Sequence, residues 1–377
     1  MTIIPNQRHR FNMPRNVHYL NCAYMSPLSD TVQAALATGA AKKAQPWSYK
    51  PDDFFGIPED FRQSAAAMLG TQSDNIAVVP SVSYALATAA KNLPLAAGQS
   101  VLVLADQFPS NLYIWRERAQ AVGAHIVTVA RDPAIGWTQA VLDAIGPDTA
   151  IAALPHNHWA DGGLLDLVAI GEKCRNVGAA LVLDLTQSLG ALPFDIAAVQ
   201  PDFCVSACYK WMMGPYGIGA LYVAPKYQDG QPIEHGWANR AGAQDFSRLT
   251  DYRDDFQSGA RRFDMGEKSN PPLLMAAKAG LDMLLEWGTQ ALSDTLAAKT
   301  CAIADAARNI GLIADDIGVR APHFLSLRFV DAVPDGLTER LAAANVFVSL
   351  RGASLRVTPH VYNDDSDAEA LIAALAG

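Results

Sequence analysis

The sequence lacks any apolar run of the roughly 18 residues that a membrane-spanning helix needs. Residues 1–10 also lack the apolar core of a signal peptide, so we expect a cytoplasmic protein with no membrane partner. Basic residues are in the minority: 29 Lys and Arg stand against 38 Asp and Glu, which gives a net charge of -9. This balance argues against a nucleic-acid partner.

Cysteine is scarce, and its spacing does not match the common metal-binding patterns. The five cysteines, at positions 22, 174, 204, 208 and 301, include no Cys-x-x-Cys pair and no Cys/His ligand spacing. An odd number of thiols suits a reducing compartment, and we expect no metal site. The glycine-rich phosphate motifs of nucleotide-binding proteins are also missing between predicted strands and helices.

Short apolar runs are abundant, and they predict an α/β protein. Seven of them lie near residues 76, 101, 126, 151, 181, 203 and 220, mostly with helical stretches between them. This alternation predicts a mostly parallel seven-stranded sheet in a large domain, residues 15–275. Residues 1–14 and 276–377 are expected to form a smaller α+β domain. Ligands bind such sheets beyond the carboxyl ends of the strands.

An aspartate and a lysine stand where two of these runs end. Asp184 closes the run that begins at Ala180, and Lys210 follows the run 203–207. If the two runs are neighbouring strands, the carboxylate and the amine project from one edge of the sheet. This pair suits catalysis with pyridoxal phosphate (PLP), because the lysine can form a Schiff base and the carboxylate can keep the pyridine nitrogen protonated. An ordinary surface lysine and a turn-capping aspartate are the alternative.

The segments around these two residues resemble the class-V aminotransferases, a family of fold-type-I PLP-dependent enzymes. Asp184-x-x-Gln187 is similar to the family's pyridine-nitrogen aspartate and the partner of the ring hydroxyl. Cys208-Tyr209-Lys210-Trp211 resembles the lysine segment in its kynureninase-like form, with Tyr209 at the phosphate. The resemblance covers nearly the whole chain. It implies the fold-type-I fold, a PLP cofactor and a cofactor site that includes Ser206.

Two further segments contribute to the cofactor site implied by the resemblance. Residues 75–91 read as strand, turn and helix, and a helix start can hold a phosphate through its unpaired N–H groups. The backbone of Val82 and the hydroxyl of Ser83 are expected there, although Ser81 or Ser83 can also simply cap the helix. Phe108 begins a Phe-Pro-Ser-Asn motif similar to that of kynureninases, whose ring stacks on the pyridine face.

The loop after the strand near residue 151 carries His156, Asn157 and His158. In relatives this loop lies beside the ring oxygen of the cofactor and the substrate. We therefore expect one of the three to line the pocket, with His156 as the candidate cofactor contact.

Substrate contacts are implied at three positions. Arg356 matches the family's arginine for the substrate carboxylate, a task that suits a guanidinium because its donors form a bidentate fork. Tyr24 and Asn111 are the other two candidates. Arg351 is either a second anion contact or a structural charge.

Two loops resemble those that reach the active site of a partner subunit in the family. They contain Trp237 and Asn270, which implies a homodimer with shared active sites. Without the resemblance, Asn270-Pro271-Pro272 reads as the start of a helix. Residues 46–58, rich in aromatic and turn residues, are expected to form a structural loop, with a mobile loop or part of a dimer surface as the alternative.

The resemblance implies an aminotransferase that acts on a small amino acid through an external aldimine, with a keto acid as a candidate co-substrate. The alternatives are a kynureninase-like C–C lyase, an amino-acid lyase or epimerase, and a PLP-binding module without catalysis. Gln187 and Asn111 replace a His and an Asp that are usual in kynureninases. A cysteine desulfurase is disfavoured, because residues 311–377 contain no cysteine that could act as its loop nucleophile.

Overall fold

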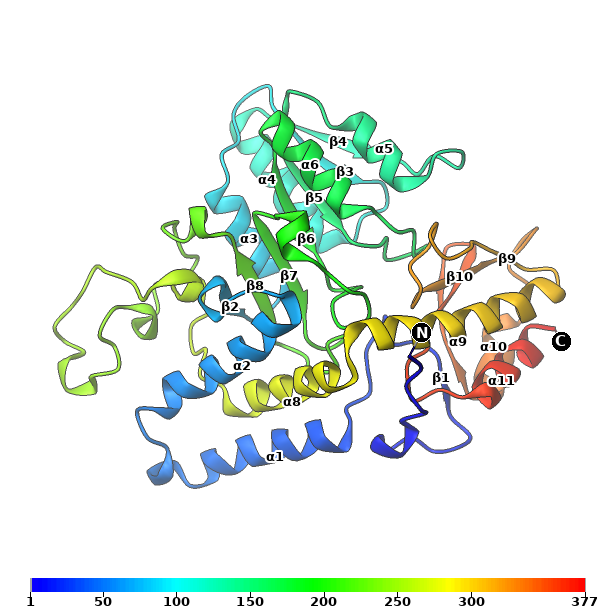
Figure 1. Ribbon diagram of the computed structural model, residues 1–377, viewed down its shortest axis with the longest axis horizontal. Coiled ribbons are helices and arrows are strands. Elements are labelled where there is room, and N and C mark those ends of the chain that lie inside the picture. Colours follow the sequence, from blue (N-terminus) through cyan, green and yellow to red (C-terminus); the bar gives the residue numbers. More distant parts are fainter. Residues whose placement is uncertain (1, 377) are drawn as a thin grey trace.

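Seven strands form a central sheet in the computed structural model, which describes residues 2–376 (Figure 1). β8 runs antiparallel to both neighbours, and the other neighbouring pairs are parallel. The predicted mostly parallel seven-stranded sheet is therefore confirmed. In spatial order the strands are β2 (Ile76–Val79), β8 (Gly219–Val223), β7 (Phe203–Ala207), β6 (Ala180–Asp184), β5 (Thr149–Pro155), β3 (Ser100–Leu104) and β4 (His125–Val129).

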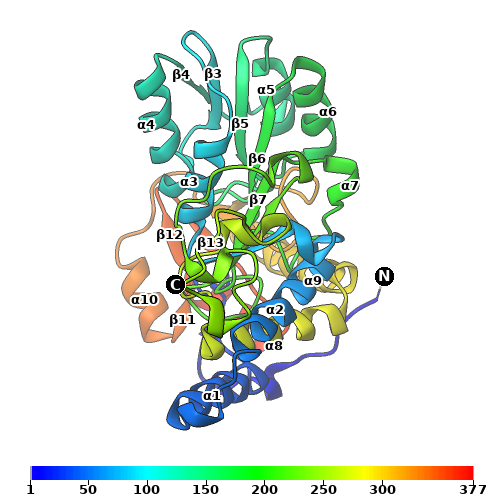
Figure 2. The same ribbon diagram turned by 90° about the vertical axis from the view of Figure 1, so that its left-hand side faces the viewer.

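Helices cover both faces of this sheet, which makes three layers (Figure 2). Successive side chains of a strand point to opposite faces. In β2, Ile76 and Val78 join one core, with α2 (Asp53–Leu69), α5 (Gly136–Ala144), α6 (Leu167–Val177), α7 (Ile196–Val199) and α8 (Pro271–Trp287). Ala77 and Val79 join the other core, with α3 (Val82–Asn92) and α4 (Tyr113–Val122). Burial on both faces explains why the strands read as continuous apolar runs.

A second body contains an antiparallel sheet and the last helices. Its strands, in spatial order, are β12 (Ser349–Arg351), β13 (Ser354–Val357), β10 (Leu325–Arg328) and β9 (Ile313–Ala314), and its helices are α9 (Thr289–Asn309), α10 (Leu337–Ala343) and α11 (Asp365–Ala376). β1 (His18–Tyr19) pairs in parallel with β11 (Val346–Phe347). The N-terminal segment is thereby joined to this body. The predicted domain limits stay predictions, and residues 1 and 377 lie outside the described part.

The start of α2 differs from expectation. Residues 46–58 were expected to form a loop, but α2 begins at Asp53 and contains Pro58. Proline has no N–H to donate within a helix, so the carbonyl of Phe54, four residues earlier, lacks its helical partner. The hydroxyl of Ser269 donates to that carbonyl instead. A contact so distant in sequence explains why the local pattern could not predict this helix.

α1 (Asp30–Ala44) packs against α8 and is capped by Ser29, whose side chain accepts a hydrogen bond from the N–H of Val32. Within residues 2–376, no helix is long and apolar enough to cross a membrane. The same residues include no group of three or more His, Cys, Asp or Glu placed to hold a metal ion.

Candidate active site

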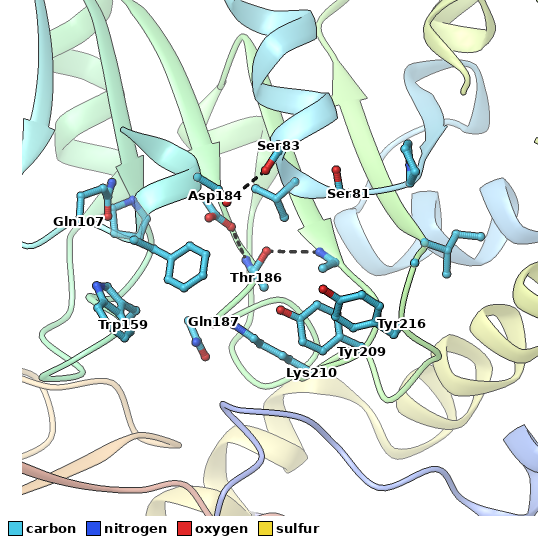
Figure 3. Close-up of a pocket in the computed structure, with 18 of the residues that line it drawn as sticks. Ser81, Ser83, Gln107, Trp159, Asp184, Thr186, Gln187, Tyr209, Lys210 and Tyr216 are labelled. Atoms are coloured by element: carbon cyan, nitrogen blue, oxygen red, sulfur yellow. Dashed lines mark hydrogen bonds between the residues drawn. The ribbon is translucent and has the colours of Figure 1, made fainter. Parts of the chain in front are cut away.

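Two adjoining cavities lie where the parallel strands of the large sheet end, and Figure 3 shows the first of them. The first cavity, about 210 Å³, is lined by segments that follow β2, β3, β5, β6 and β7 and by the segment that precedes β8. The second cavity, about 280 Å³, adds residues from the N-terminal segment and from the β12–β13 hairpin. The residues that line both are Phe108, Trp159, Gln187, Tyr209, Lys210 and Tyr216.

Lys210 is buried and lines both cavities, three residues beyond the end of β7. Burial lowers the pKa of its ammonium group to about 8, the nearby Asp184 opposes this shift, and the positive charge of Arg356 adds to it. The Nζ atom lies 5.4 Å from the ring centroids of both Phe108 and Tyr209. A lysine in this environment is partly neutral near pH 8, as a nucleophile or a base must be.

Asp184 ends β6 and is buried at the floor of the first cavity. Burial raises the pKa of its carboxyl group, while hydrogen bonds from Thr186 and the charge of Lys210 act in the opposite direction. The backbone N–H of Thr186 donates to Oδ1 at 3.0 Å. A cationic ligand group beside this carboxylate would stabilise its charged form.

Gln187 is held in place by hydrogen bonds at both ends of its side-chain amide. Its Oε1 accepts from Nε1 of Trp211 at 3.0 Å, and its Nε2 donates to the carbonyl of Ala23 at 3.2 Å. The backbone carbonyl of Gln187 lies 2.6 Å from Nε2 of the buried His323. These contacts fix the orientation of an amide that lines both cavities.

The N-terminus of α3 opens onto the first cavity. Ser81 is the N-cap, because its Oγ accepts from the N–H of Tyr84 at 3.1 Å. Val82 and Ser83 follow it in the lining of the cavity, and Oγ of Ser83 lies 3.1 Å from Oγ of Ser110. The first N–H groups of a helix have no intrahelical partner and carry its positive dipole end. This part of the cavity is suited to a phosphate group.

Aromatic rings form the walls of the site. Phe108 and Trp159 meet edge to face, with ring centroids 5.5 Å apart, and Nε1 of Trp159 donates to the carbonyl of Asp106 at 2.6 Å. Tyr209 and Tyr216 lie on the other side, with ring centroids 4.6 Å apart. These rings and Asp184 line the same cavity (Figure 3).

Tyr24, Arg351 and Arg356 line the second cavity. Tyr24 is 56% exposed, whereas Arg356 is only 2% exposed and donates to the carbonyl of Trp159 at 3.1 Å. Burial lowers the pKa of Arg356 to about 10, and the charge of Arg351 adds to this effect. Because the shifted pKa is still well above neutral, Arg356 remains a cation.

Three expectations need correction. Asn111 is buried outside both cavities, and its Oδ1 accepts from Nε1 of Trp115 at 3.0 Å. His156 points into a separate hollow, next to Phe194, with ring centroids 6.1 Å apart. Ser206 lies within β7, and because its neighbour Ala207 lines the first cavity, the alternation of a strand turns Ser206 away.

Of the other two residues in the His156 loop, Asn157 lines the first cavity, whereas His158 does not. The ring of His158 stacks on Trp137, with centroids 5.0 Å apart. The candidate pocket residue of this loop is therefore Asn157.

Trp237 and Asn270 lie outside both cavities of their own chain. Trp237 packs against Phe54, Phe55 and Phe246, and the Oδ1 of Asn270 caps α8 by accepting from the N–H of Leu273. The cap agrees with the alternative interpretation of this segment as a helix start. Their contact with a partner subunit stays a prediction.

Several lining residues were not singled out from the sequence, among them Gln107, Trp159, Thr186 and Tyr216. Gln107, Trp159 and Thr186 stand two to four residues after the ends of β3, β5 and β6, so the strand-end rule could have found them. Tyr216 precedes β8 and reaches the site by packing on Tyr209, a contact with no local sequence signal.

A buried lysine between two cavities, an aspartate at the end of a parallel strand and a helix N-terminus facing the same space define, with this fold, a fold-type-I PLP-dependent enzyme. The family model described as "Aminotransferase class-V" matches residues 47–356, so the chain belongs to the class-V aminotransferase family. The resemblance predicted from the sequence is thereby confirmed.

Curated relatives with several names resemble the chain. The "Uncharacterized aminotransferase YcbU" of Bacillus subtilis (strain 168) is 27% identical over 80% of this chain and 78% of its own length. A "Kynureninase" of Deinococcus radiodurans is 28% identical over 70% of this chain and 64% of its own length. These names span two reaction types, so they establish the family but not the reaction.

Solved structures confirm the fold. A mutant of C-DES with glycine covalently linked to its PLP cofactor superposes with a TM-score of 0.87, at 18% identity, over 98% of this chain and 99% of that chain. The apo structure of a cysteine desulfurase from Thermococcus onnurineus NA1 gives a TM-score of 0.84 at 17% identity, over 100% and 98% of the two chains.

Pyridoxal phosphate is the cofactor of this chain, as its family and these structures indicate. The first cavity fits it in three respects. Asp184 suits the pyridine nitrogen, because its buried carboxylate would gain a cationic neighbour. The start of α3, with Ser83, suits the phosphate. Lys210, partly neutral near pH 8, suits the aldehyde carbon.

Proposed function

We propose that the chain is a PLP-dependent aminotransferase that acts on a small amino acid. The observation that carries the proposal is the position of Lys210, which lines both cavities and has a lowered pKa. A group so placed can act on a cofactor in one cavity and on a substrate in the other. The similarity to YcbU, whose name is that of an aminotransferase, supports this choice of reaction.

When bound, pyridoxal phosphate supplies an electron sink for the electron pair that remains after the α-proton of the substrate leaves. The residues of the chain then have distinct tasks. Lys210 takes the α-proton on its neutral Nζ and returns a proton, and Asp184 holds a positive charge on the ring nitrogen. Gln187 would donate to the ring oxygen from an amide whose orientation is fixed by Trp211 and Ala23.

The remaining residues position the reactants. Val82, Ser83 and Tyr209 line the first cavity and would hold the phosphate, and Phe108, in the same lining, would pack on the ring. Arg356 orients the α-carboxylate of the substrate from the second cavity, while Tyr24 closes part of its edge. Fixed orientation of the α-carbon matters because Lys210 must reach only one of its substituents.

A lyase or epimerase is the second candidate. It is supported by the kynureninase relatives and by the aromatic lining of the second cavity, where Tyr24, Trp159 and Tyr216 could pack on a larger side chain. A cysteine desulfurase is less well supported. Among the described residues, no cysteine lines either cavity, four are buried, and Cys301 is exposed on α9.

We further propose a homodimer in which Trp237 and Asn270 approach the partner's site. The exposure of Trp237 within an aromatic cluster supports this arrangement. Sedimentation at several protein concentrations would test it, and a monomer at all concentrations would contradict it.

The reaction can be tested by adding amino acids one at a time to the purified holoenzyme and assaying keto acids. An aminotransferase releases one keto acid for each cofactor converted to its amine form, and a second keto acid restores the original absorbance. Side-chain cleavage products or an inverted amino acid without a keto acid would instead identify a lyase or an epimerase.

Lys210→Ala should lower the rate of the chemical step by about 100- to 10,000-fold, the usual contribution of a general acid–base residue. Arg356→Ala should raise KM by at least about tenfold and leave the cofactor bound. Lys226→Ala, at a lysine whose side chain is 66% exposed, is the control and should retain activity. Full activity of the Lys210 variant would overturn the proposal.

A further inference from the structure

Arg351 and Arg356 come from the two strands of one tight hairpin. Arg351 pairs with Ser354 across a two-residue turn, and Ser349 pairs with Arg356. Gly352 occupies the first turn position with φ of 57°, a conformation that glycine adopts without strain. Paired residues of antiparallel strands point to the same face of the sheet, and so do residues two apart on one strand. Arg351 and Arg356 are therefore diagonal neighbours on one face, a relation in which the Cα atoms lie about 7–8 Å apart. Both line the second cavity.

Neither arginine has an anionic partner within the described chain. No ion pair among residues 2–376 includes Arg351 or Arg356, and the second cavity has no Asp or Glu in its lining. Each guanidinium donates only to a backbone carbonyl, that of Leu350 or of Trp159. The Nε atoms of both are buried without a hydrogen-bond partner.

The second cavity therefore holds two guanidinium cations beside Lys210 and no carboxylate. Two guanidinium groups on one small cavity repel each other, and a buried cation without a partner destabilises the fold. A substrate with a single carboxylate could satisfy Arg356 but would leave Arg351 unpaired. The guanidinium carbon of Arg351 lies over the ring of Trp159, 5.7 Å from the ring centroid.

We propose that the substrate is a short amino acid with a second anionic group at the end of its side chain, such as a carboxylate or a sulfinate. Arg356 binds its α-carboxylate and Arg351 binds the side-chain anion. The inference rests on the proposed function, and it names the substrate class of that same site. The aromatic rings that line the cavity would contact the methylene groups between the two anions of the substrate.

Binding of unreactive acids tests this without turnover. The holoenzyme is titrated calorimetrically with glutarate and with valerate, which have the same carbon chain but two and one carboxylates. We expect glutarate to bind at least about tenfold more tightly, the effect of one charge-assisted contact. Equal affinities, or no binding of glutarate, would overturn the inference.

Variants assign the preference to one side chain. Arg351→Gln should remove the preference for glutarate and leave the affinity for valerate unchanged, whereas Arg356→Gln should weaken both. Arg351→Lys, which keeps the charge, should keep part of the preference. Arg15→Gln removes a charge from a side chain that is 81% exposed and should change neither affinity. If Arg351→Gln weakens both acids equally, Arg351 does not read a second anion.

An assay of keto acids from acidic and neutral amino acids tests the substrate class and the reaction type separately. Aspartate, glutamate and cysteine sulfinate are compared with asparagine, glutamine and cysteine. A keto acid from the neutral members alone would overturn the inference and leave the aminotransferase reaction in place. Selective reaction of the acidic members without a keto acid would overturn the aminotransferase proposal and retain the substrate class.

Discussion

At the scale of single residues, the reactivity of Lys210 depends on the balance between burial and its charged neighbours. Burial is the largest influence and favours the neutral amine, Asp184 favours the ammonium form, and Arg356 again favours the neutral amine. The same arginine that is proposed to hold the substrate thus also tunes the lysine.

This coupling predicts the pH dependence of cofactor uptake. The rate at which the apoenzyme takes up pyridoxal phosphate should rise with pH and reach its midpoint near the lysine pKa of about 8. Arg356→Gln removes a nearby positive charge, so the pKa of Lys210 should rise and the midpoint should move to higher pH. The measurement is stopped-flow absorbance between pH 6.5 and about 10. An unmoved midpoint, matching that of Arg15→Gln, would show that Arg356 does not influence the lysine.

The sequence predicts some of these residues better than others. Asp184 and Lys210 could be located because strand ends meet at one edge of a parallel sheet, whatever the side-chain details. Asn111 and His156 also follow strands, but the turn that each occupies directs the side chain elsewhere. Such directions depend on contacts like that between Asn111 and Trp115, which a pattern of residue types does not contain.

At the scale of elements, a buried network of Arg62, Asp264 and Lys268 connects α2 to β2 and to the segment before α8. Asp264 accepts from the N–H of Val78 at 2.8 Å and from Lys268 at 2.8 Å, and it pairs with Arg62. Arg62 also donates to the carbonyl of Ile76 at 2.6 Å. All three charged side chains are buried, and Asp264 is the carboxylate common to both cations.

Asp264→Asn should therefore lower the free energy of unfolding by about 3–5 kcal/mol, because it leaves buried cations without their shared anion. Urea unfolding followed by circular dichroism measures the change. Asp251→Asn, which breaks the exposed pair with Arg248, is the matched control and should have a much smaller effect. Similar losses for both variants would mean that the buried network adds no particular stability.

The elements themselves were largely predictable. The seven strands were found because each is a short, mostly apolar run, and all but the edge strand β4 are buried along most of their length. The start of α2 was missed, because the contact between Ser269 and the carbonyl of Phe54 lies more than half the chain away in sequence. Arg351 and Arg356 could have been placed on one face from the spacing Arg351-Gly-Ala-Ser-Leu-Arg356, had the two-residue turn been recognised.

At the scale of the whole molecule, three histidines lie between the sheet and the second body: His323 and His360, which are buried, and His156, which is half-buried. Burial lowers their pKa values to about 4, 3 and 3, respectively. They are neutral at pH 7 in the folded chain. In the unfolded chain each regains a pKa of about 6.5.

Below about pH 6.5, the unfolded chain therefore binds protons that the folded chain does not, and stability falls as the pH falls. Each histidine contributes about 1.4 kcal/mol per pH unit to this slope. His360→Leu should reduce the slope between about pH 6 and 4.5 by that amount, measured by urea unfolding at several pH values. His9→Leu, at an exposed histidine, should leave the slope unchanged. An unchanged slope in the His360 variant would contradict the assignment.

The parallel pairing of β1 with β11 also has a consequence for synthesis on the ribosome. His18 and Tyr19 are made more than 300 residues before their strand partners Val346 and Phe347, so the pairing must wait until those partners have left the ribosome. The large sheet, complete by β8, can form before then. Tyr24 and Arg356 can therefore meet at the second cavity only after Arg356 has left the ribosome. We expect a nascent chain truncated before β11 to protect the large sheet from proteolysis while its first residues remain accessible.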